Sequence, residues 1–448
     1  MTSEVLLMNR ECLVMAADSA ATVSDGYISK VFTTDKIFKL SDSQPIGIMF
    51  YGNAAINSIP LSLIVNQYRS QTRDCSFGTL EEAAENFLDF LANGCTVEPR
   101  RYEPIIDRQS IDMTVIQMVY GLWKQLTNWV TIEISRGISS TLISKNGRIS
   151  LTNNTKEIMT SILGQLRPTE EDIAESKADA NEWGYDWKEN YETNLRGIIS
   201  AMEKNDVCPE TPSMMSFCFD DFRDDVLEII ALRMTMPGSM DDVTGVVIAG
   251  YGGDEIYPSF KQYEIDGYYY AGLNAINMDV VSIDFDRRSW IETFAQRDVV
   301  ETYLNGINPQ IKEKILDDIK TMLDRNVRNI CGKPRGEKDK ERVNRLLTDN
   351  EKAIEDYSDV LEGYCEEYSE PMKDAIAFLS KDEMAKLAKS MVDFTSLKKR
   401  VSLDLETVGG PADVVVLSKH DGFVWIERKQ YFNMELNPGY ELNKHQRR

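Results

Sequence analysis

The stretch MTSEVLLMNRECLVMAADSAAT, residues 1–22, places a threonine directly behind the initiator methionine. Two apolar runs separated by a polar Asn-Arg-Glu break predict a strand, a tight turn and a second strand. Chain termini are commonly frayed, so Thr2 can be ordinary filler at the end of the first strand. In the other interpretation Thr2 becomes the N-terminal residue and acts as a nucleophile. The remaining sequence has to distinguish the two.

Composition limits the classes of partner. Of the 448 residues 42% are hydrophobic, which is enough for a packed core, and 73 acidic against 50 basic residues give a formal net charge of −23. Such a surface repels phosphate backbones and anionic membranes, so no nucleic-acid or membrane partner is expected. The N-terminus has no secretory pattern, and no apolar run approaches the roughly 18 residues of a membrane span. We therefore expect a cytoplasmic protein.

Histidine and cysteine chemistry is sparse. The seven cysteines contain no C-x-x-C pair and their number is odd, which argues against a disulfide framework. The only histidines are His420, in a predicted hairpin turn where a solvated side chain is expected, and His445 in a polar tail. Zinc-ligand spacing is absent, so neither a metal nor a cofactor is expected. An enzyme with this sequence needs a base other than histidine.

Patterning indicates strands at both ends and in the middle of the chain, with helices between them. Further strands are predicted at 45–52, 243–253 and 256–267, and two more within 407–429. Amphipathic helices are predicted at 53–70, 79–94 and 381–402, and helical periodicity also runs through 281–370. This arrangement predicts an α+β protein.

The strands at the two ends favour one core interrupted by two helical insertions. The predicted core comprises 1–95, 241–280 and 371–432, the insertions are 96–240 and 281–370, and 433–448 is a polar C-terminal tail. The alternative is two independent domains that divide near residue 240. That division leaves the strands at 243–265 without obvious partners.

A mature Thr2 carries a hydroxyl and a free α-amine on one residue. Methionine aminopeptidases remove the initiator methionine when the next residue is small, as threonine is. An α-amine titrates at about 7.7–8.0, so a useful fraction is neutral near pH 7 and can act as the base for its own hydroxyl. This chemistry removes the need for a histidine.

Three further residues fit what that nucleophile needs. Asp18 ends the second strand of the opening hairpin, which returns the chain to the neighbourhood of Thr2. Lys36, in TTDKIFKL, supplies a cation that holds the amine neutral and lowers the pKa of the hydroxyl. Gly52, at the end of PIGIMFYG and the head of the predicted helix, can offer a backbone N–H to an oxyanion. Taken singly, each of these residues has an ordinary structural explanation.

The stretches TSEVLLM…LVMAADSAAT, DKIFKL and IGIMFYGNAA resemble the start of a proteasome β-type subunit, a member of the N-terminal-nucleophile (Ntn) hydrolases that include the HslV-like peptidases. In that family the nucleophilic threonine begins the mature chain and an aspartate follows sixteen residues later, as Asp18 follows Thr2. A lysine in K-I-x-x-[IL] and a glycine at the first helix come next, matching Lys36 and Gly52. The resemblance implies an αββα sandwich core.

The resemblance resumes at VVIAGYGGDEIYPSFKQYEIDG and again at DLETVGGP followed by DVVVLSKHDGF. By that match Asp404 and Thr407 supply the acid and hydroxyl that support the nucleophile. The hydroxyl is threonine instead of serine and one extra residue precedes the Gly-Gly, so Glu406 is an alternative acid. A further supporting hydroxyl of the family has three candidates, namely Ser282, Ser289 and Thr293. The two insertions have no counterpart in a plain β-type subunit.

Three functions follow from these patterns. The first is a threonine peptidase that cleaves peptide bonds through an acyl-enzyme on Thr2. The second is an amidohydrolase of the same fold acting on a small amide, and the third is a non-catalytic proteasome-like scaffold. The intact Thr2, Asp18 and Lys36 set favours the first two. By resemblance alone, a homo-oligomer and an ATP-dependent unfoldase partner are expected.

Overall fold

The computed structural model describes residues 3–24, 29–93, 142–145, 148–151, 243–269, 272–278, 280–332, 336–401 and 409–430, with Thr114, Thr160, Gly164, Arg167, Ile229 and Phe432. Most of the predicted insertion at 96–240, and the tail at 433–448, lie outside them.

The opening stretch forms the predicted hairpin at the centre of an antiparallel sheet. β1 (Ser3–Asn9) pairs with β2 (Leu13–Ala17), and the Asn9 side chain accepts hydrogen bonds from the backbone N–H groups of Glu11 and Cys12 across the turn. The full strand order is β15-β1-β2-β16-β17, with β15 at Ser289–Ala295, β16 at Asp413–Ser418 and β17 at Gly422–Glu427. This sheet joins distant parts of the chain.

A second antiparallel sheet has the order β13-β12-β11-β6-β5, with β14 paired to β12. Its strands are β5 (Ile37–Lys39), β6 (Ile46–Gly52), β11 (Thr244–Gly250), β12 (Ser259–Tyr269), β13 (Gly272–Asn277) and β14 (Val281–Ser282). Because β11 pairs directly with β6, the strands near residue 250 belong to the same sheet as β5 and β6. Short hairpins are β3 (Ala20–Ser24) with β4 (Ser29–Thr33), β7 (Ala55–Ile56) with β8 (Ile59–Pro60), and β9 (Leu142–Lys145) with β10 (Arg148–Leu151).

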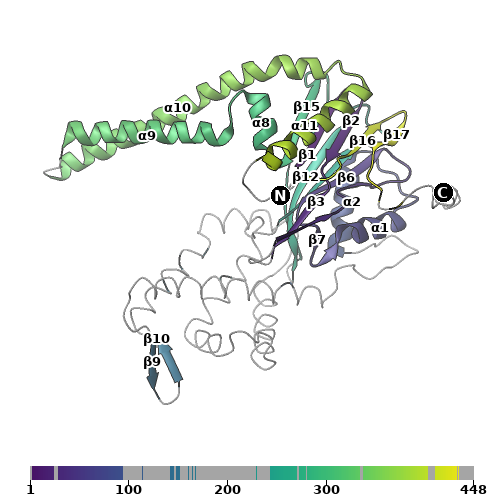
Figure 1. Ribbon diagram of the computed structural model, residues 1–448, viewed down its shortest axis with the longest axis horizontal. Helices are drawn as coiled ribbons and strands as arrows, with labels where there is room; N and C mark the ends of the chain where they lie inside the picture. Colours follow the sequence, from purple (N-terminus) through teal and green to yellow (C-terminus); the bar gives the residue numbers. More distant parts are fainter. Residues whose placement is uncertain are drawn as a thin grey trace.

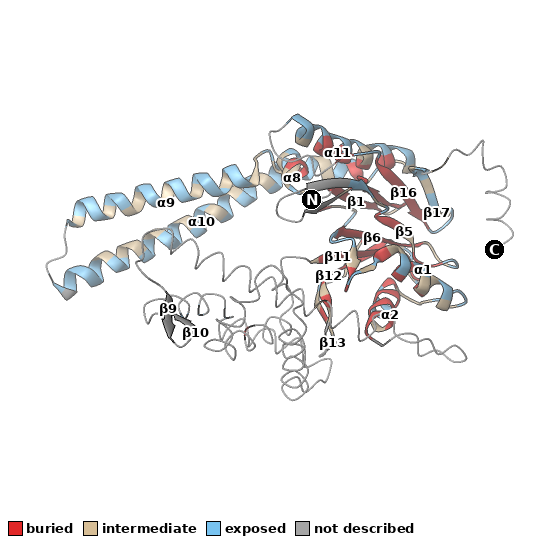
Figure 2. Cartoon of the chain, turned by 60° about the horizontal axis from the view of Figure 1, so that its bottom comes forward, coloured by how far each residue is buried: buried red, intermediate tan, exposed pale blue. Residues whose placement is uncertain are grey.

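The two sheets face each other and helices cover their outer faces (Figure 1). All of β1 is buried, and its alternate side chains pack in opposite directions, as strand geometry requires. Leu6 and Met8 face the second sheet, whereas Val5 and Leu7 pack against α11 (Lys381–Val401). On the far side α2 (Leu80–Asn93) covers β11 and β12, next to α1 (Leu61–Gln71). The order of layers is helix, sheet, sheet, helix, as Figure 2 shows from α11 through the two sheets to α2.

Two long helices project from this core. α8 (Asp298–Asn305) leads into α9 (Pro309–Cys331), and α10 (Glu337–Ile376) runs back antiparallel to α9 toward α11 (Figure 1). We call the α9–α10 hairpin the arm. Within the described residues no helix is both long and apolar enough to cross a membrane.

The structure confirms the α+β class and differs from the predicted elements in two places. The range 281–370 was expected to be helical, but β14 and β15 occupy its beginning, and helix starts only at Asp298. β15 pairs with β1 nearly 290 residues away, a long-range contact that local periodicity does not report. The helix expected from residue 53 begins at Leu61, because Asn57 and Ser58 have positive φ and form the β7–β8 turn.

Replacing Gly52 by alanine is expected to lower the free energy of unfolding by about 1–3 kcal/mol. Gly52 has φ +77°, and an added Cβ would lie 2.3 Å from the carbonyl oxygen of Val243. Gly363→Ala is the matched control, because a Cβ there meets nothing within 4 Å and the position is inside α10. Gly363→Ala is expected to raise the free energy of unfolding by about 0.5–1 kcal/mol, because alanine favours a helix interior over glycine. Urea unfolding of the two variants measures both changes in the free energy of unfolding. Changes in the same direction would contradict the prediction.

Candidate active site

Asp18 ties the end of the hairpin to its beginning. Its carboxylate Oδ1 accepts a hydrogen bond of 2.9 Å from the backbone N–H of Ser3, and its own N–H donates to the Ser3 carbonyl over 3.1 Å. Asp18 is buried. The residue that follows Thr2 is therefore held directly against the aspartate that sequence spacing singled out.

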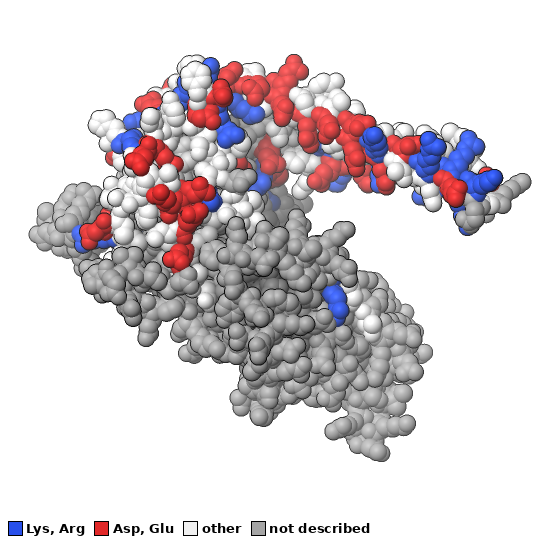
Figure 3. Space-filling model, turned by 180° about the vertical axis from the view of Figure 1, so that it is seen from behind, with Lys and Arg blue, Asp and Glu red and all other residues white. Residues whose placement is uncertain are grey.

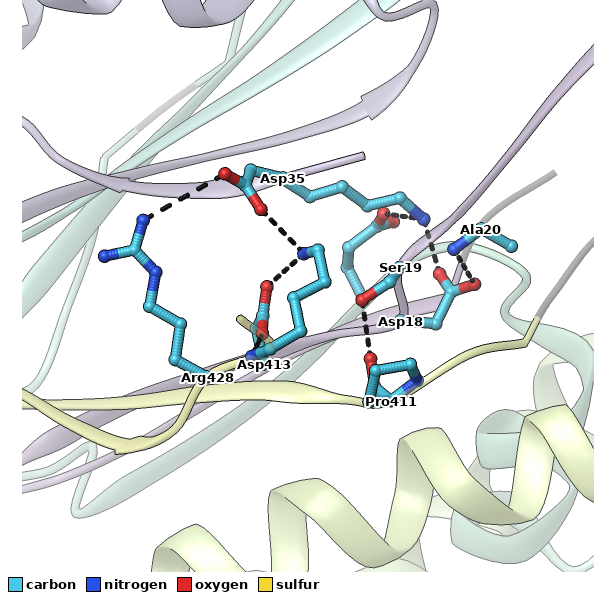
Figure 4. Close-up of polar contacts among 10 residues, drawn as sticks. Asp18, Ser19, Ala20, Asp35, Pro411, Asp413 and Arg428 are labelled. Atoms are coloured by element: carbon cyan, nitrogen blue, oxygen red, sulfur yellow. Dashed lines mark hydrogen bonds and ion pairs between the residues drawn. The ribbon is translucent and has the colours of Figure 1, made fainter. Parts of the chain in front are cut away.

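The other oxygen of Asp18 is also occupied. Oδ2 accepts a hydrogen bond of 3.1 Å from the N–H of Ala20 (Figure 4). It accepts another of 3.0 Å from the N–H of Gly409. Ser19 reinforces the link, since its hydroxyl donates to the Pro411 carbonyl and its N–H donates to the Gly409 carbonyl. The segment that enters β16 is thus bound to the same carboxylate as the start of β1.

Lys36 completes a buried charge cluster. Its Nζ lies 2.5 Å from Asp18 Oδ1 and 3.5 Å from Glu4 Oε1, and all three side chains are at most 5% exposed. The Lys36 carbonyl accepts a hydrogen bond from Phe50 N–H, which anchors the lysine to β6. Two carboxylates therefore surround one ammonium in a site with almost no solvent, where removal of either partner is costly.

Glu4 was not among the predicted site residues. It lies in SEVLLMN, a strand in which every residue is buried. A buried acid in such a strand needs a charge partner, so a glutamate within an apolar run was the sequence signal that could have identified Glu4. The partner, Lys36, is not identifiable from spacing because the β3–β4 hairpin intervenes.

A cavity of about 850 Å³ opens beside the cluster. Lys36 and Asp35 line it from the entry to β5, and Gly52 lines it from the end of β6. Peptide N–H groups alternate in direction along a strand, and Phe50 N–H points to Lys36. By that alternation the Gly52 N–H points to the same edge, beyond the start of β5 and toward the cavity.

A second set of ion pairs lies at the cavity, between Asp35 and the residues that follow β17. Lys429 Nζ contacts the Asp413 carboxylate and lies 2.9 Å from Asp35 Oδ1, and Lys429 N–H donates to Asp413 over 2.7 Å. Arg428 lies 4.0 Å from the other oxygen of Asp35 (Figure 4). These contacts hold the chain that follows β17 against the loop before Lys36. Sequence reasoning did not anticipate this set.

Two other titratable groups near the core are unsuited to catalysis at neutral pH. Burial, with a smaller contribution from Glu264, raises the pKa of Tyr51, whose hydroxyl donates to that glutamate over 3.0 Å. Burial likewise raises the pKa of the Cys12 thiol to about 12, so Cys12 is not a thiolate nucleophile. The His420 side chain is 93% exposed, which confirms its expected position in a solvated turn.

The other predicted residues fall into two groups, those outside the described part of the chain and the three hydroxyl candidates within it. Thr2, Asp404, Glu406 and Thr407 lie outside the described residues, as does His445. Among the three hydroxyl candidates, Ser289 donates to the Lys373 carbonyl of α10, Thr293 is paired with Val5, and Ser282 is paired with Ser259 in the second sheet. Within the described parts of the chain, no group of three or more His, Cys, Asp or Glu side chains is arranged to hold a metal ion.

Comparisons with known proteins add little to this picture. No protein-family model and no curated protein matches the chain. A solved structure of a Gly-1 mutant of Anbu from Hyphomicrobium sp. strain MC1 is similar, with 10% sequence identity and a TM-score of 0.26. The alignment covers 100% of this chain and 96% of that chain. Similarity at this TM-score does not establish a common fold.

Proposed function

We propose that this protein is a threonine-type Ntn hydrolase that cleaves peptide or amide bonds, with Thr2 as nucleophile after removal of Met1. The observation that carries the proposal is the buried Lys36–Asp18 pair, hydrogen-bonded to Ser3 and bordering a cavity of about 850 Å³. A cavity of this size accommodates a short peptide or a small amide.

In the proposed reaction the α-amine of Thr2 takes the proton of the Thr2 hydroxyl as Oγ attacks the substrate carbonyl carbon. The Lys36 ammonium favours the neutral amine and the alkoxide-like oxygen, because a nearby positive charge lowers the pKa of both groups. Asp18 and Glu4 hold Lys36 in place and balance its charge. The proposed oxyanion donor is the Gly52 N–H.

Collapse of the tetrahedral intermediate breaks the carbon–nitrogen bond, and the protonated α-amine gives its proton to the departing amine. Water, activated by the same α-amine, then attacks the ester carbonyl on Thr2 and releases the acid. Asp404 and Thr407 are proposed, by resemblance, as supports for the threonine. This scheme needs neither histidine nor metal.

Intact-mass measurement tests the precondition. The purified protein is expected to lack one methionine residue, because the scheme requires a free α-amine on Thr2. The variant Thr2→Leu is the matched control, since a bulky second residue prevents removal of Met1. A wild-type protein that retains Met1 in full would contradict the mechanism.

A further inference from the structure

The arm lacks a hydrophobic core of its own. No residue of α9 is buried, although all 23 residues of that helix are described. The seam between α9 and α10 contains half-buried residues, among them Leu316 and Leu323 on α9 and Leu361 and Cys365 on α10. Helices in proteins owe most of their stability to the packing of an apolar face, and this seam alone gives helices of this length little such packing.

α9 carries a second apolar row beside the seam. Ile311, Ile315 and Met322 are between 41% and 54% exposed. Ile315 directly precedes Leu316 and Met322 directly precedes Leu323, so this row is rotated from the seam by about 100°.

α10 carries an equivalent row, which is largely aromatic. Its members are Tyr357, Val360, Tyr364 and Tyr368, between 43% and 63% exposed. Val360 precedes Leu361 and Tyr364 precedes Cys365, so this row also comes one residue before its seam.

Both rows lie on the same side of the arm. In two antiparallel helices that face each other, the residues that come one position before the seam in each helix lie on the same side of the pair. The residues that follow the seam by one, such as Glu362 and Lys320, form the ion pairs Lys312–Glu362 and Lys320–Glu351 on the other side. The arm therefore has one apolar side, which we call the tyrosine face, and one ion-paired side.

Charge changes sign along the arm. Basic residues outnumber acidic ones near the tip, where Arg325, Arg328, Lys340, Arg342 and Arg345 stand with Asp339 and Glu341, and acidic residues dominate toward the core, where they include Asp356, Asp359, Glu366 and Glu367 (Figure 3). Two arms laid antiparallel would bring each basic tip against the acidic base of the other. Parallel arms would place acid against acid and base against base.

We propose that the tyrosine face binds the tyrosine face of a second copy of this chain, with the arms antiparallel about a two-fold axis. Self-complementary charge and a self-facing apolar surface are what a two-fold interface requires, because each patch must fit its own copy. The four helices then enclose the rows that a single arm leaves in water. This interface is separate from the proposed catalytic site.

Sedimentation velocity of the full chain across a concentration series tests the interface. Wild type is expected to form assemblies with an even number of chains, and the double variant Ile315→Glu with Tyr364→Glu is expected to have half that mass. The apparent dissociation constant should rise on the order of 30-fold or more, as for loss of a central interface contact. Ile256→Glu, at a more exposed isoleucine in the loop before β12, is the control away from the arm and should leave the mass unchanged.

Charge reversal tests the antiparallel arrangement. Arg325→Glu with Arg342→Glu should weaken association, and addition of Asp356→Lys with Glu367→Lys to the same chain should restore it. Circular dichroism checks that each variant keeps its helices. A wild type that is monomeric throughout, or a face variant with wild-type mass, would overturn the proposal, and failure of the second pair to restore association would overturn the antiparallel arrangement.

Discussion

Thr2→Ala is expected to reduce hydrolysis of a fluorogenic peptide amide by at least about 10⁴-fold. Removal of the hydroxyl leaves the α-amine and Lys36 in place but takes away the atom proposed to form the acyl-enzyme, and loss of a nucleophile in other hydrolases has effects of this size. Release of the fluorescent amine, followed at saturating and subsaturating reporter, measures the loss in kcat and in kcat/KM.

The neighbouring hydroxyl provides the control. Ser3→Ala removes a hydroxyl one residue away, while the backbone N–H that donates to Asp18 remains. This variant is expected to keep activity within a few-fold of wild type. Equal activity of Thr2→Ala and wild type would assign the nucleophile elsewhere, whereas equal losses in both variants would point to a general disturbance of β1.

Lys36→Met is expected to lower the free energy of unfolding by about 3–5 kcal/mol and to remove activity. The methionine occupies a similar volume, so the main change is that Asp18 and Glu4 remain buried near each other without their cation. The effect is measured as a shift of the urea midpoint together with the slope of the transition.

A second, less buried lysine provides a comparison for the stability loss of Lys36→Met. Lys429 pairs with Asp413, which is 4% exposed, and with Asp35, which is 43% exposed. Lys429→Met leaves one buried carboxylate without its cation instead of two, so it should cost less than Lys36→Met. Combining Lys36→Met with Glu4→Gln should recover part of the lost stability, because one uncompensated buried charge disappears while the backbone hydrogen bonds to Asp18 remain. An unchanged midpoint for Lys36→Met would contradict a coupled cluster.

The site's near neighbours in sequence were predictable because hairpin geometry is local. Apolar alternation places Thr2 and Asp18 at the open end of one hairpin, and the structure holds Ser3 against Asp18 as that pattern predicts. Lys36 comes from the entry to a short strand in the other sheet, so its contact with Asp18 followed only from chemistry and resemblance. Glu4 was hidden within an apolar run.

Long-range pairing limited the rest. The sequence pattern did not distinguish β15 from a helix. β15 is stabilised as a strand by pairing with β1, nearly 290 residues away, and local periodicity contains no information about so distant a partner. The Asp35–Lys429–Asp413 set joins residues from three separate segments of the chain, for which spacing carries no information. The arm's helices were predictable from periodicity, but its tyrosine face emerged only once the seam between the helices was known.

The measurement that most directly tests Thr2 as nucleophile is covalent labelling read by peptide mass. A peptide epoxyketone has two electrophilic carbons, one in the ketone and one in the epoxide. Stable double attachment requires a hydroxyl oxygen and a free α-amine nitrogen on the same residue. The account predicts a single adduct on the N-terminal peptide beginning at Thr2, present in wild type and absent from Thr2→Ala. An adduct at another residue, or equal labelling of the two proteins, would contradict it.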